Sequence, residues 1–301
     1  MLFVELWIVA SDFSRVIAVD FSAASSPTRG ANSIWRAVAE DDGPIRTQNF
    51  ATRYELANDL EQLVSATGRS LVVFDIALGW PAGFARSIGL SHRRAESTDQ
   101  LLDELLDDER NNFNNRFDVA NELNQRAGSP IFWGHPRGRT FSHLSPTTVG
   151  RLENFPELLH DKRLIEQNVG GVIKSPFQLT GAGAVGGQSL VGQVFVRRLK
   201  HRGLDISVWP FSERQSRVVI GEYYFSLTPW KLEIGSVPDQ KQVRATVRWL
   251  RRELRSRRNP LSSDLFKEAN SIQRRGIINE EGWLVGWPMR QRSSGAVTRL
   301  I

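Results

Sequence analysis

Short apolar runs and one amphipathic segment alternate along the N-terminal part of the chain. Runs rich in β-branched residues are typical of buried strands, and they predict strands at 15–21, 33–40 and 70–76, with a weaker candidate at 45–50. Residues 53–66 carry apolar side chains at the spacing of one helix face, which predicts an amphipathic helix. The N-terminal part is therefore expected to fold as two or three strands, a helix and a further strand.

The middle of the chain has a different pattern. Residues 101–109 combine leucines with acids and predict an acidic amphipathic helix, whereas the asparagines at 111–115 break regular structure. Residues 128–150 are rich in Pro, Gly, Ser and Thr and predict loops. Because no linker rich in Gly and Ser flanks residues 85–204, we interpret this region as a long insertion of helices and loops, not as a free-standing domain.

The C-terminal part returns to the pattern of the first. It predicts two short strands at 205–209 and 217–221, a long helix at 239–258 that ends before Pro260, and a last helix at 262–275. The expected units are residues 1–84 and 205–301 as the two parts of one α/β domain, with 85–204 as its insertion.

Composition indicates a soluble globular protein. Of the 301 residues, 40% are apolar and 24% are charged. The absence of cysteine excludes disulfides and thiolate metal sites, and the five histidines lack the paired spacing of a zinc site. The net charge of +6 favours polyanion binding without establishing it.

No feature of the sequence predicts a membrane protein. No apolar stretch reaches the roughly 18 residues that cross a bilayer. The apolar start, residues 1–10, carries Glu5 and lacks the basic region of a signal peptide, so the expected localisation is cytoplasmic. Residues 1–14 precede the first clear strand and are expected to be an extra strand or a loosely attached extension.

Acidic residues stand at the ends of the predicted buried strands, where they contribute little to stability. Asp20 ends the first strand, Asp75 follows the apolar residues of a later one, and Glu222 follows the strand at 217–221; Asp264 lies near the start of the last predicted helix. Brought together, three or four carboxylates make an oxygen-rich site for Mg²⁺ or Mn²⁺. The alternative is that Asp20 and Asp75 cap turns, where aspartate is common.

Four short blocks occur in order along the chain: the first three carry Asp20, Asp75 and Glu222, and the fourth follows Asp264. They are Val19-Asp20-Phe21-Ser22, Asp75-Ile76-Ala77-Leu78-Gly79-Trp80-Pro81, Glu222-Tyr223-Tyr224-Phe225 and Glu280-Glu281-Gly282-Trp283. Over residues 15–84 and 205–287 this order resembles a widespread bacterial family of uncharacterised proteins predicted to be RNase H-like nucleases. Segments 175–186 and 208–211 resemble a subgroup that has this insertion.

The resemblance implies an α/β fold in which helices flank an RNase H-like mixed sheet, and a metal-dependent nuclease or related phosphoryl-transfer activity. In a two-metal mechanism Asp20 would bridge both ions, Asp75 and Asp264 would each bind one, and Glu222 would complete the shell or orient water. Ala77 and Phe225 depart from the family pattern. Lys267 replaces a second acid, which leaves the fourth ligand open between Asp264 and Glu268.

Glycines at 181, 183 and 186 form a G-x-G-x-x-G pattern ahead of a predicted helix. Gly181, Gly183 and Gly186 can let backbone N–H groups approach a phosphate, of a dinucleotide cofactor or of another ligand such as nucleic acid. Close packing or a mobile loop is the alternative. A dinucleotide site of an oxidoreductase needs a strand directly before the glycines and an acid ending the next strand, yet residues 174–180 are a poor strand and Asp205 begins the next one.

A basic stripe runs along the predicted helix at 239–258. Arg244, Arg248, Arg251 and Arg255 recur there at helical spacing. Arginine makes bidentate contacts with phosphate, which give affinity for nucleic acid regardless of its sequence; a solvated helix face is the alternative. The expected partner is therefore nucleic acid or a phosphorylated small molecule, and a non-catalytic protein that binds such a ligand remains a second hypothesis.

Overall fold

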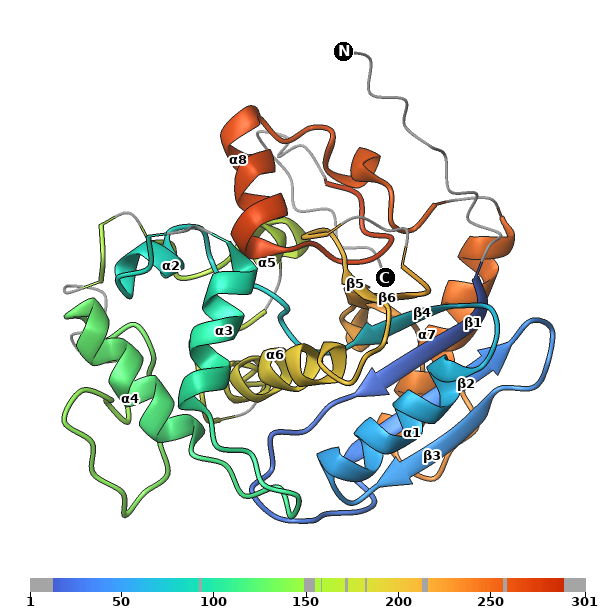
Figure 1. Cartoon of the computed structure of the whole chain (residues 1–301), viewed down its shortest axis with the longest axis horizontal. Helices are drawn as coiled ribbons and strands as arrows, with labels where there is room; N and C mark the ends of the chain where they lie inside the picture. Colours follow the sequence, from blue (N-terminus) through green and yellow to red (C-terminus); the bar gives the residue numbers. More distant parts are fainter. Residues whose placement is uncertain are drawn as a thin grey trace.

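Six strands form one mixed sheet at the centre of the structure (Figure 1). The structure is a computed structural model, and it describes residues 13–91, 94–148, 155–157, 159–170, 173–181, 183–212, 216–256 and 259–289. The strands are β1 (Phe13–Asp20), β2 (Ile34–Glu40), β3 (Arg46–Phe50), β4 (Arg69–Phe74), β5 (Ile206–Val208) and β6 (Val218–Glu222). Of the expected extension at 1–14, residues 1–12 lie outside the described part of the chain, and Phe13 and Ser14 begin β1.

The order of strands across the sheet is β3-β2-β1-β4-β6-β5. The first three in sequence are antiparallel neighbours, whereas β4, β6 and β5 continue the sheet in parallel with β1. The expected α/β class with a mixed sheet is confirmed, and each predicted strand agrees with an observed one to within two residues at either end. Residues from both ends of the chain thus share one sheet.

Eight α-helices and three shorter helical turns accompany the sheet in the described residues. The helices are α1 (Arg53–Ser65), α2 (Phe84–Ser87), α3 (Ala95–Leu105), α4 (Arg116–Ala127), α5 (Leu164–Val169), α6 (Gly186–Lys200), α7 (Pro238–Arg255) and α8 (Ser271–Gly276). The turns are η3 (Phe225–Leu227), η4 (Ser263–Phe266) and η5 (Ile277–Glu281). Within this part of the chain, none of the helices combines the length and apolar character that a bilayer crossing requires.

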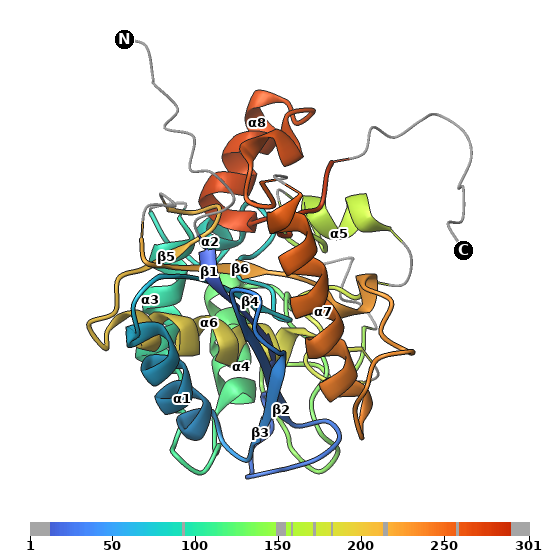
Figure 2. The same cartoon turned by 90° about the vertical axis from the view of Figure 1, so that its right-hand side faces the viewer.

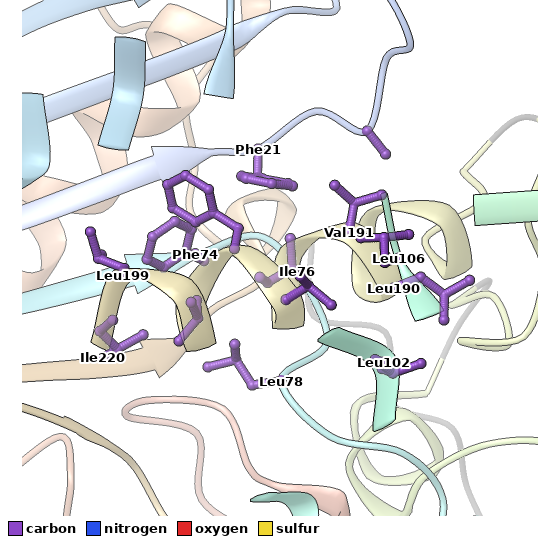
Figure 3. Packing of buried hydrophobic residues seen from close by; sticks show 14 of the residues in the cluster. Phe21, Phe74, Ile76, Leu78, Leu102, Leu106, Leu190, Val191, Leu199 and Ile220 are labelled. Atoms are coloured by element: carbon purple, nitrogen blue, oxygen red, sulfur yellow. The ribbon is translucent and has the colours of Figure 1, made fainter. Parts of the chain in front are cut away.

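Helices cover both faces of the sheet (Figure 2). On one face lie α1 and α6, and the ring of Phe195 in α6 lies 5.2 Å from that of Phe21 and 6.1 Å from that of Phe74 (Figure 3). On the other face α7 buries Val243 and Val247, which belong to its predicted apolar stripe. Alternate residues of the central strands face these two layers, as the period of a strand requires.

Helix α6 lies within the predicted insertion at 85–204, yet it is part of the main core. Gly192 allows this close packing, because a Cβ on it would lie 2.5 Å from Cδ1 of Ile76, the residue that follows Asp75. Figure 3 shows Ile76 against this helix. The glycine-rich segment before α6 is therefore held near the ends of the central strands.

Two predicted helices differ from the observed ones. The acidic helix expected at 101–109 begins earlier, at Ala95, and ends at Leu105. The last helix expected at 262–275 is interrupted: η4 ends at Phe266, and α8 starts again at Ser271. Asn270 accounts for the break, because its side chain accepts hydrogen bonds from the first turn of α8 as an N-cap.

Three of the four sequence blocks meet in space beside the sheet. The N–H of Trp80 donates to the carbonyl of Glu280 at 2.9 Å, and the Glu281 carboxylate accepts the N–H of Ala82. The carbonyl of Glu222 accepts the N–H of Val285 at 2.9 Å. Glu280 and Glu281, the acids in the last block, thus connect segments that are far apart in the sequence.

We expect Gly79→Ala to lower the free energy of unfolding by about 1–3 kcal/mol, the usual cost of overpacking. A Cβ on Gly79 would lie 2.3 Å from the carbonyl oxygen of Glu280, which is backbone and cannot move aside cheaply. Gly276→Ala is the matched control, since its Cβ would meet only the Ala82 methyl at 3.5 Å. Urea denaturation of both variants checks this, and equal stabilities would contradict the packing described.

Candidate active site

Asp20 and Asp75 lie side by side at the C-terminal ends of β1 and β4. These strands are parallel neighbours, and Val19 pairs with Phe74, so the two aspartates follow paired positions. Val19 and Phe74 face the α6 layer, so alternation along each strand directs both aspartates to the α7 side of the sheet. Two of the predicted site residues are therefore brought together.

The surroundings of this pair oppose negative charge. Burial raises the pKa of Asp75 to about 7, with a further contribution from the charge of Glu222, while the N–H of Phe225 donates to the carboxylate and lowers it. Burial, followed by Asp75 and then Asp239, raises the pKa of Asp20 well above its usual range. Neither carboxylate makes an ion pair with a described residue. Clustered, uncompensated carboxylates of this kind mark functional sites more often than structural ones.

Glu222 lies next to Asp75 but has other partners. Its carboxylate accepts two hydrogen bonds from the buried guanidinium of Arg163, at 2.5 Å and 2.8 Å, and one from the N–H of Leu78 at 3.0 Å. Strand alternation places it on the opposite side of the sheet from Asp75, with Val218 and Ile220. Glu222 therefore contributes its charge to the site, while its oxygens belong to a buried ion-pair network.

The structure does not bring Asp264 or Glu268 to this pair. Both are exposed, and they follow the C-terminal end of α7. Within the described residues no group of three or more acids is arranged to hold a metal ion. The expected convergence of Asp20, Asp75 and Asp264 is therefore not found there.

The third acid near Asp20 is Asp239, and not Asp264 as the sequence predicted. It lies in the first turn of α7, and its carboxylate accepts the N–H of Asn32, in the loop after β1, at 2.6 Å. Its charge also raises the pKa of Asp20. Proline followed by an acid, as in Pro238 and Asp239, is a common start of a helix. In the sequence Asp239 is therefore explained as a helix-start residue, and no pattern indicates that it lies near the site.

The number of carboxylates at the site decides how a divalent ion could be held there. Within the described residues no group of three or more Asp, Glu or His is arranged to hold one. Mg²⁺ in phosphoryl-transfer sites, however, is commonly held by one or two carboxylates together with waters and substrate phosphates. Asp20 and Asp75 meet that smaller requirement, and the raised pKa values of both carboxyls are what a bound cation would reverse.

A cavity of about 640 Å³ opens beside Asp75. Lys174 and Gly183 line it together with Ser226, so a cation, a glycine backbone and a hydroxyl border the same space as the acid. Lys174 makes no ion pair with any described residue. A cavity with an acid and a free ammonium suits an anionic substrate, and sequence reasoning missed Lys174 because no motif marks it.

The glycines of the G-x-G-x-x-G pattern have separate roles. Gly183 has a φ of +72° and lines the cavity, whereas Gly186 is needed for packing, since its Cβ would lie 2.6 Å from the carbonyl oxygen of Pro176. Gly181, with a φ of +100°, begins the turn. Residues 173–181 contain only an isolated bridge at Gln178 and no strand. The strand that a dinucleotide-binding motif requires is therefore missing there.

Arg116 is a second cation near the site that sequence reasoning missed. Its guanidinium donates to Ser25 and Asn114, both neutral, at 2.8 Å, and it lies against Gly187 at the start of α6. Burial, with the nearby Arg53, lowers its pKa to about 10. No carboxylate compensates it among the described residues.

No protein-family model, curated protein or solved structure matches this chain. The site is therefore interpreted from its own geometry. Its defining features are two adjacent carboxylates that pair with no cation among the described residues, and a cavity beside Asp75 that Lys174 lines.

The predicted arginine stripe lies on α7, and it leads away from this site. Arg244 and Arg251 donate to the carbonyls of Ile45 and Gly43 in the turn between β2 and β3. The stripe begins about one turn after Asp239 and continues to the other end of the helix. Its arginines therefore border the acid pair only at the N-terminal end of α7.

Proposed function

We propose that this protein hydrolyses phosphodiester bonds in a nucleic acid or nucleotide, with Asp20 and Asp75 as the catalytic carboxylates. One observation carries the proposal: these two acids lie at neighbouring ends of parallel strands, with raised pKa values and no cationic partner in the part of the chain that the structure describes. Stability does not explain such an arrangement, because a half-buried carboxylate that has no cation beside it costs free energy, even where a backbone N–H donates to it as at Asp75.

The topology of the sheet supports the proposal. Three antiparallel strands followed by a parallel β4, with helices on both faces, is the arrangement expected of an RNase H-like core. The acids at the ends of β1 and β4 also agree with the positions that the family resemblance implies. Fold alone does not determine activity, so the argument depends on the chemistry of the site.

A divalent cation, Mg²⁺ or Mn²⁺, fits the chemistry that the pair offers. Asp20 and Asp75 would hold it, with waters and substrate oxygens completing its shell. When bound, such an ion neutralises charge that develops on the phosphoryl oxygens and lowers the pKa of water. Asp264 and Glu268 have no part in this version of the site.

The protein's own residues supply the rest of the mechanism. Lys174 holds a phosphoryl oxygen of a substrate in the cavity and so orients the phosphorus toward the acids. A water oxygen forms the new bond to phosphorus while the bond to the leaving oxygen breaks, and the proton that the water loses passes through solvent to the leaving oxygen. Asp75, whose pKa lies near 7 in the cation-free protein, would be ionised when it holds the cation, so its role is to bind the ion.

A non-catalytic binding protein is the competing function, and the free Lys174 in the cavity favours it too. The hydrolase and the binding protein differ in whether the bound ligand is cleaved. Labelled single- and double-stranded DNA and RNA, and a dinucleotide, should be incubated with the protein in Mg²⁺, in Mn²⁺ and in EDTA.

The proposal predicts cleavage of at least one substrate that needs the cation and disappears in Asp20→Asn. Cleavage that persists in Asp20→Asn would refute the assigned site. Binding of these ligands with no cation-dependent cleavage would favour the non-catalytic function instead.

A further inference from the structure

Five arginines of α7 line one groove on the surface of the described structure. The groove has a volume of about 540 Å³ and lies between the helix and the turn that joins β2 to β3. We call it the arginine groove, and its lining residues are Gly43, Pro44, Ile45, Arg244, Arg248, Arg251, Arg252 and Arg255. Arg252 was not part of the predicted stripe.

The arginines divide into two groups by exposure. Arg244 and Arg251 are 19% and 16% exposed at the side chain and hold the β2–β3 turn through its carbonyls. Arg248, Arg252 and Arg255 are 61%, 75% and 58% exposed. The first group fixes the shape of the groove, and the second presents guanidinium groups to solvent.

Carboxylates compensate these arginines only in part. Glu233 pairs with Arg248 at 2.7 Å, and Asp42 pairs with Arg255 from a side chain that is 88% exposed. Glu253 approaches Arg252 at 3.9 Å, at the limit of an ion pair. The pair with Asp42 is exposed at both side chains and contributes little, so an anionic ligand can replace it at small cost. Glu233 and Glu253 are only 12% and 14% exposed, and their arginines keep guanidinium surface open to solvent.

We infer that the arginine groove docks the sugar-phosphate backbone of a nucleic acid whose chain continues to the Asp20–Asp75 site. The inference rests on the proposed function and deepens it, because it makes the substrate a polymer and not a mononucleotide. The Asp239 end of α7 lies beside Asp20, so the helix connects the groove to the acids.

The length of the groove fits this ligand. From Arg244 to Arg255 the helix rises about 16 Å. Phosphates of one duplex strand recur about every 3.4 Å, so roughly five of them face such a stripe. Planar guanidinium groups match phosphate oxygens in pairs, which gives affinity without dependence on base sequence.

The test compares two triple variants of equal charge. Arg248→Ala, Arg252→Ala and Arg255→Ala empty the exposed part of the groove. Arg110→Ala, Arg126→Ala and Arg217→Ala remove the same charge from other surfaces. Fluorescence anisotropy measures binding of a labelled single-stranded oligonucleotide long enough to span α7, DNA or RNA, in EDTA.

The groove variant should bind the oligonucleotide about tenfold or more weakly than the control variant at low salt. Its plot of log affinity against log salt should be flatter by about 2–3, since each phosphate contact contributes about 0.7–0.9 to the slope. Cation-dependent hydrolysis of a dinucleotide should be unchanged, because a dinucleotide does not reach the groove.

Equal oligonucleotide binding by the two triple variants would overturn the inference. So would tighter binding of an acidic peptide than of the oligonucleotide by the wild type. In either case dinucleotide hydrolysis that still depends on Asp20 leaves the proposed function standing. Should the groove variant fail to fold, Arg252→Glu alone serves, since Arg252 has the most exposed side chain of the five.

Discussion

Asp75→Asn should lower kcat for phosphodiester hydrolysis by about 10²–10³, because the cation would lose one of its two carboxylate ligands and with it several kcal/mol of charge stabilisation. The change keeps the shape of the side chain and removes its charge, so the cavity beside it should remain. Asp99→Asn is the matched control: burial also raises the pKa of that carboxyl, to about 8, but it lies on α3 beside Arg197. The control should keep full activity, and an equal loss in both variants would contradict the assignment.

The same substitution should stabilise the protein at alkaline pH. The pKa of Asp75 is about 7 in the folded chain and near its usual value of about 4 in the unfolded chain. Between these pH values only the unfolded chain loses its proton, so the wild type loses stability as pH rises through this window. The side chain that Asp75→Asn introduces has no titratable proton in this pH range, so the variant does not lose stability in this way.

We therefore expect Asp75→Asn to raise the free energy of unfolding by about 2–4 kcal/mol at pH 8, with little effect at pH 4. Urea denaturation in EDTA checks this without a bound cation. A destabilised variant at pH 8 would mean that the charge of Asp75 is compensated in the free protein, and it would remove the main argument for the site.

Arg163→Met should lower the free energy of unfolding by about 3–5 kcal/mol, the cost of breaking a buried ion pair. The guanidinium is fully buried and pairs with Glu166 at 2.6 Å and with Glu222 at 2.5 Å. Burial opposes its charge, yet these two acids outweigh that effect and hold the pKa of Arg163 well above its usual range. Without the Arg163 guanidinium, the carboxylates of Glu166 and Glu222 would be buried with no cation beside them.

Glu222→Gln in the Arg163→Met background should recover part of that loss, because it removes one of the two stranded charges. Arg126→Met is the control, since it breaks only an exposed pair with Glu122. Denaturation midpoints of the four proteins test the network. If Arg163→Met lowers the free energy of unfolding by less than about 1 kcal/mol, the Glu222 carboxylate does not need the Arg163 guanidinium to compensate its charge.

The sequence predicts the sheet well because its strands are marked by local composition. The β-branched runs before Asp20 and Asp75 are short and apolar, and only buried strands satisfy both features. The long α7 is equally clear from the spacing of Val243 and Val247. These local signals also place two acids at the ends of neighbouring strands.

Residues that act through distant partners could not be predicted. The partner of Glu222 is Arg163, 59 positions away, and no periodicity connects them. Asp239 reaches Asn32 across 207 positions. The interpretation of Asp264 as a ligand depended on the family resemblance, which implies an acid on a late helix; in the structure Asp264 is an exposed residue of the short η4. Local patterns determine elements, whereas the site depends on how those elements pack.

Calorimetric titration of Mn²⁺ tests the central claim most directly, namely that Asp20 and Asp75 form a cation-binding catalytic pair. The wild type and Asp264→Asn should bind Mn²⁺ alike, because Asp264 is an exposed residue of η4 and has no part in the proposed site. Asp20→Asn and Asp75→Asn should each lose binding. Wild type that binds no Mn²⁺, or binding that Asp264→Asn abolishes, would contradict the account.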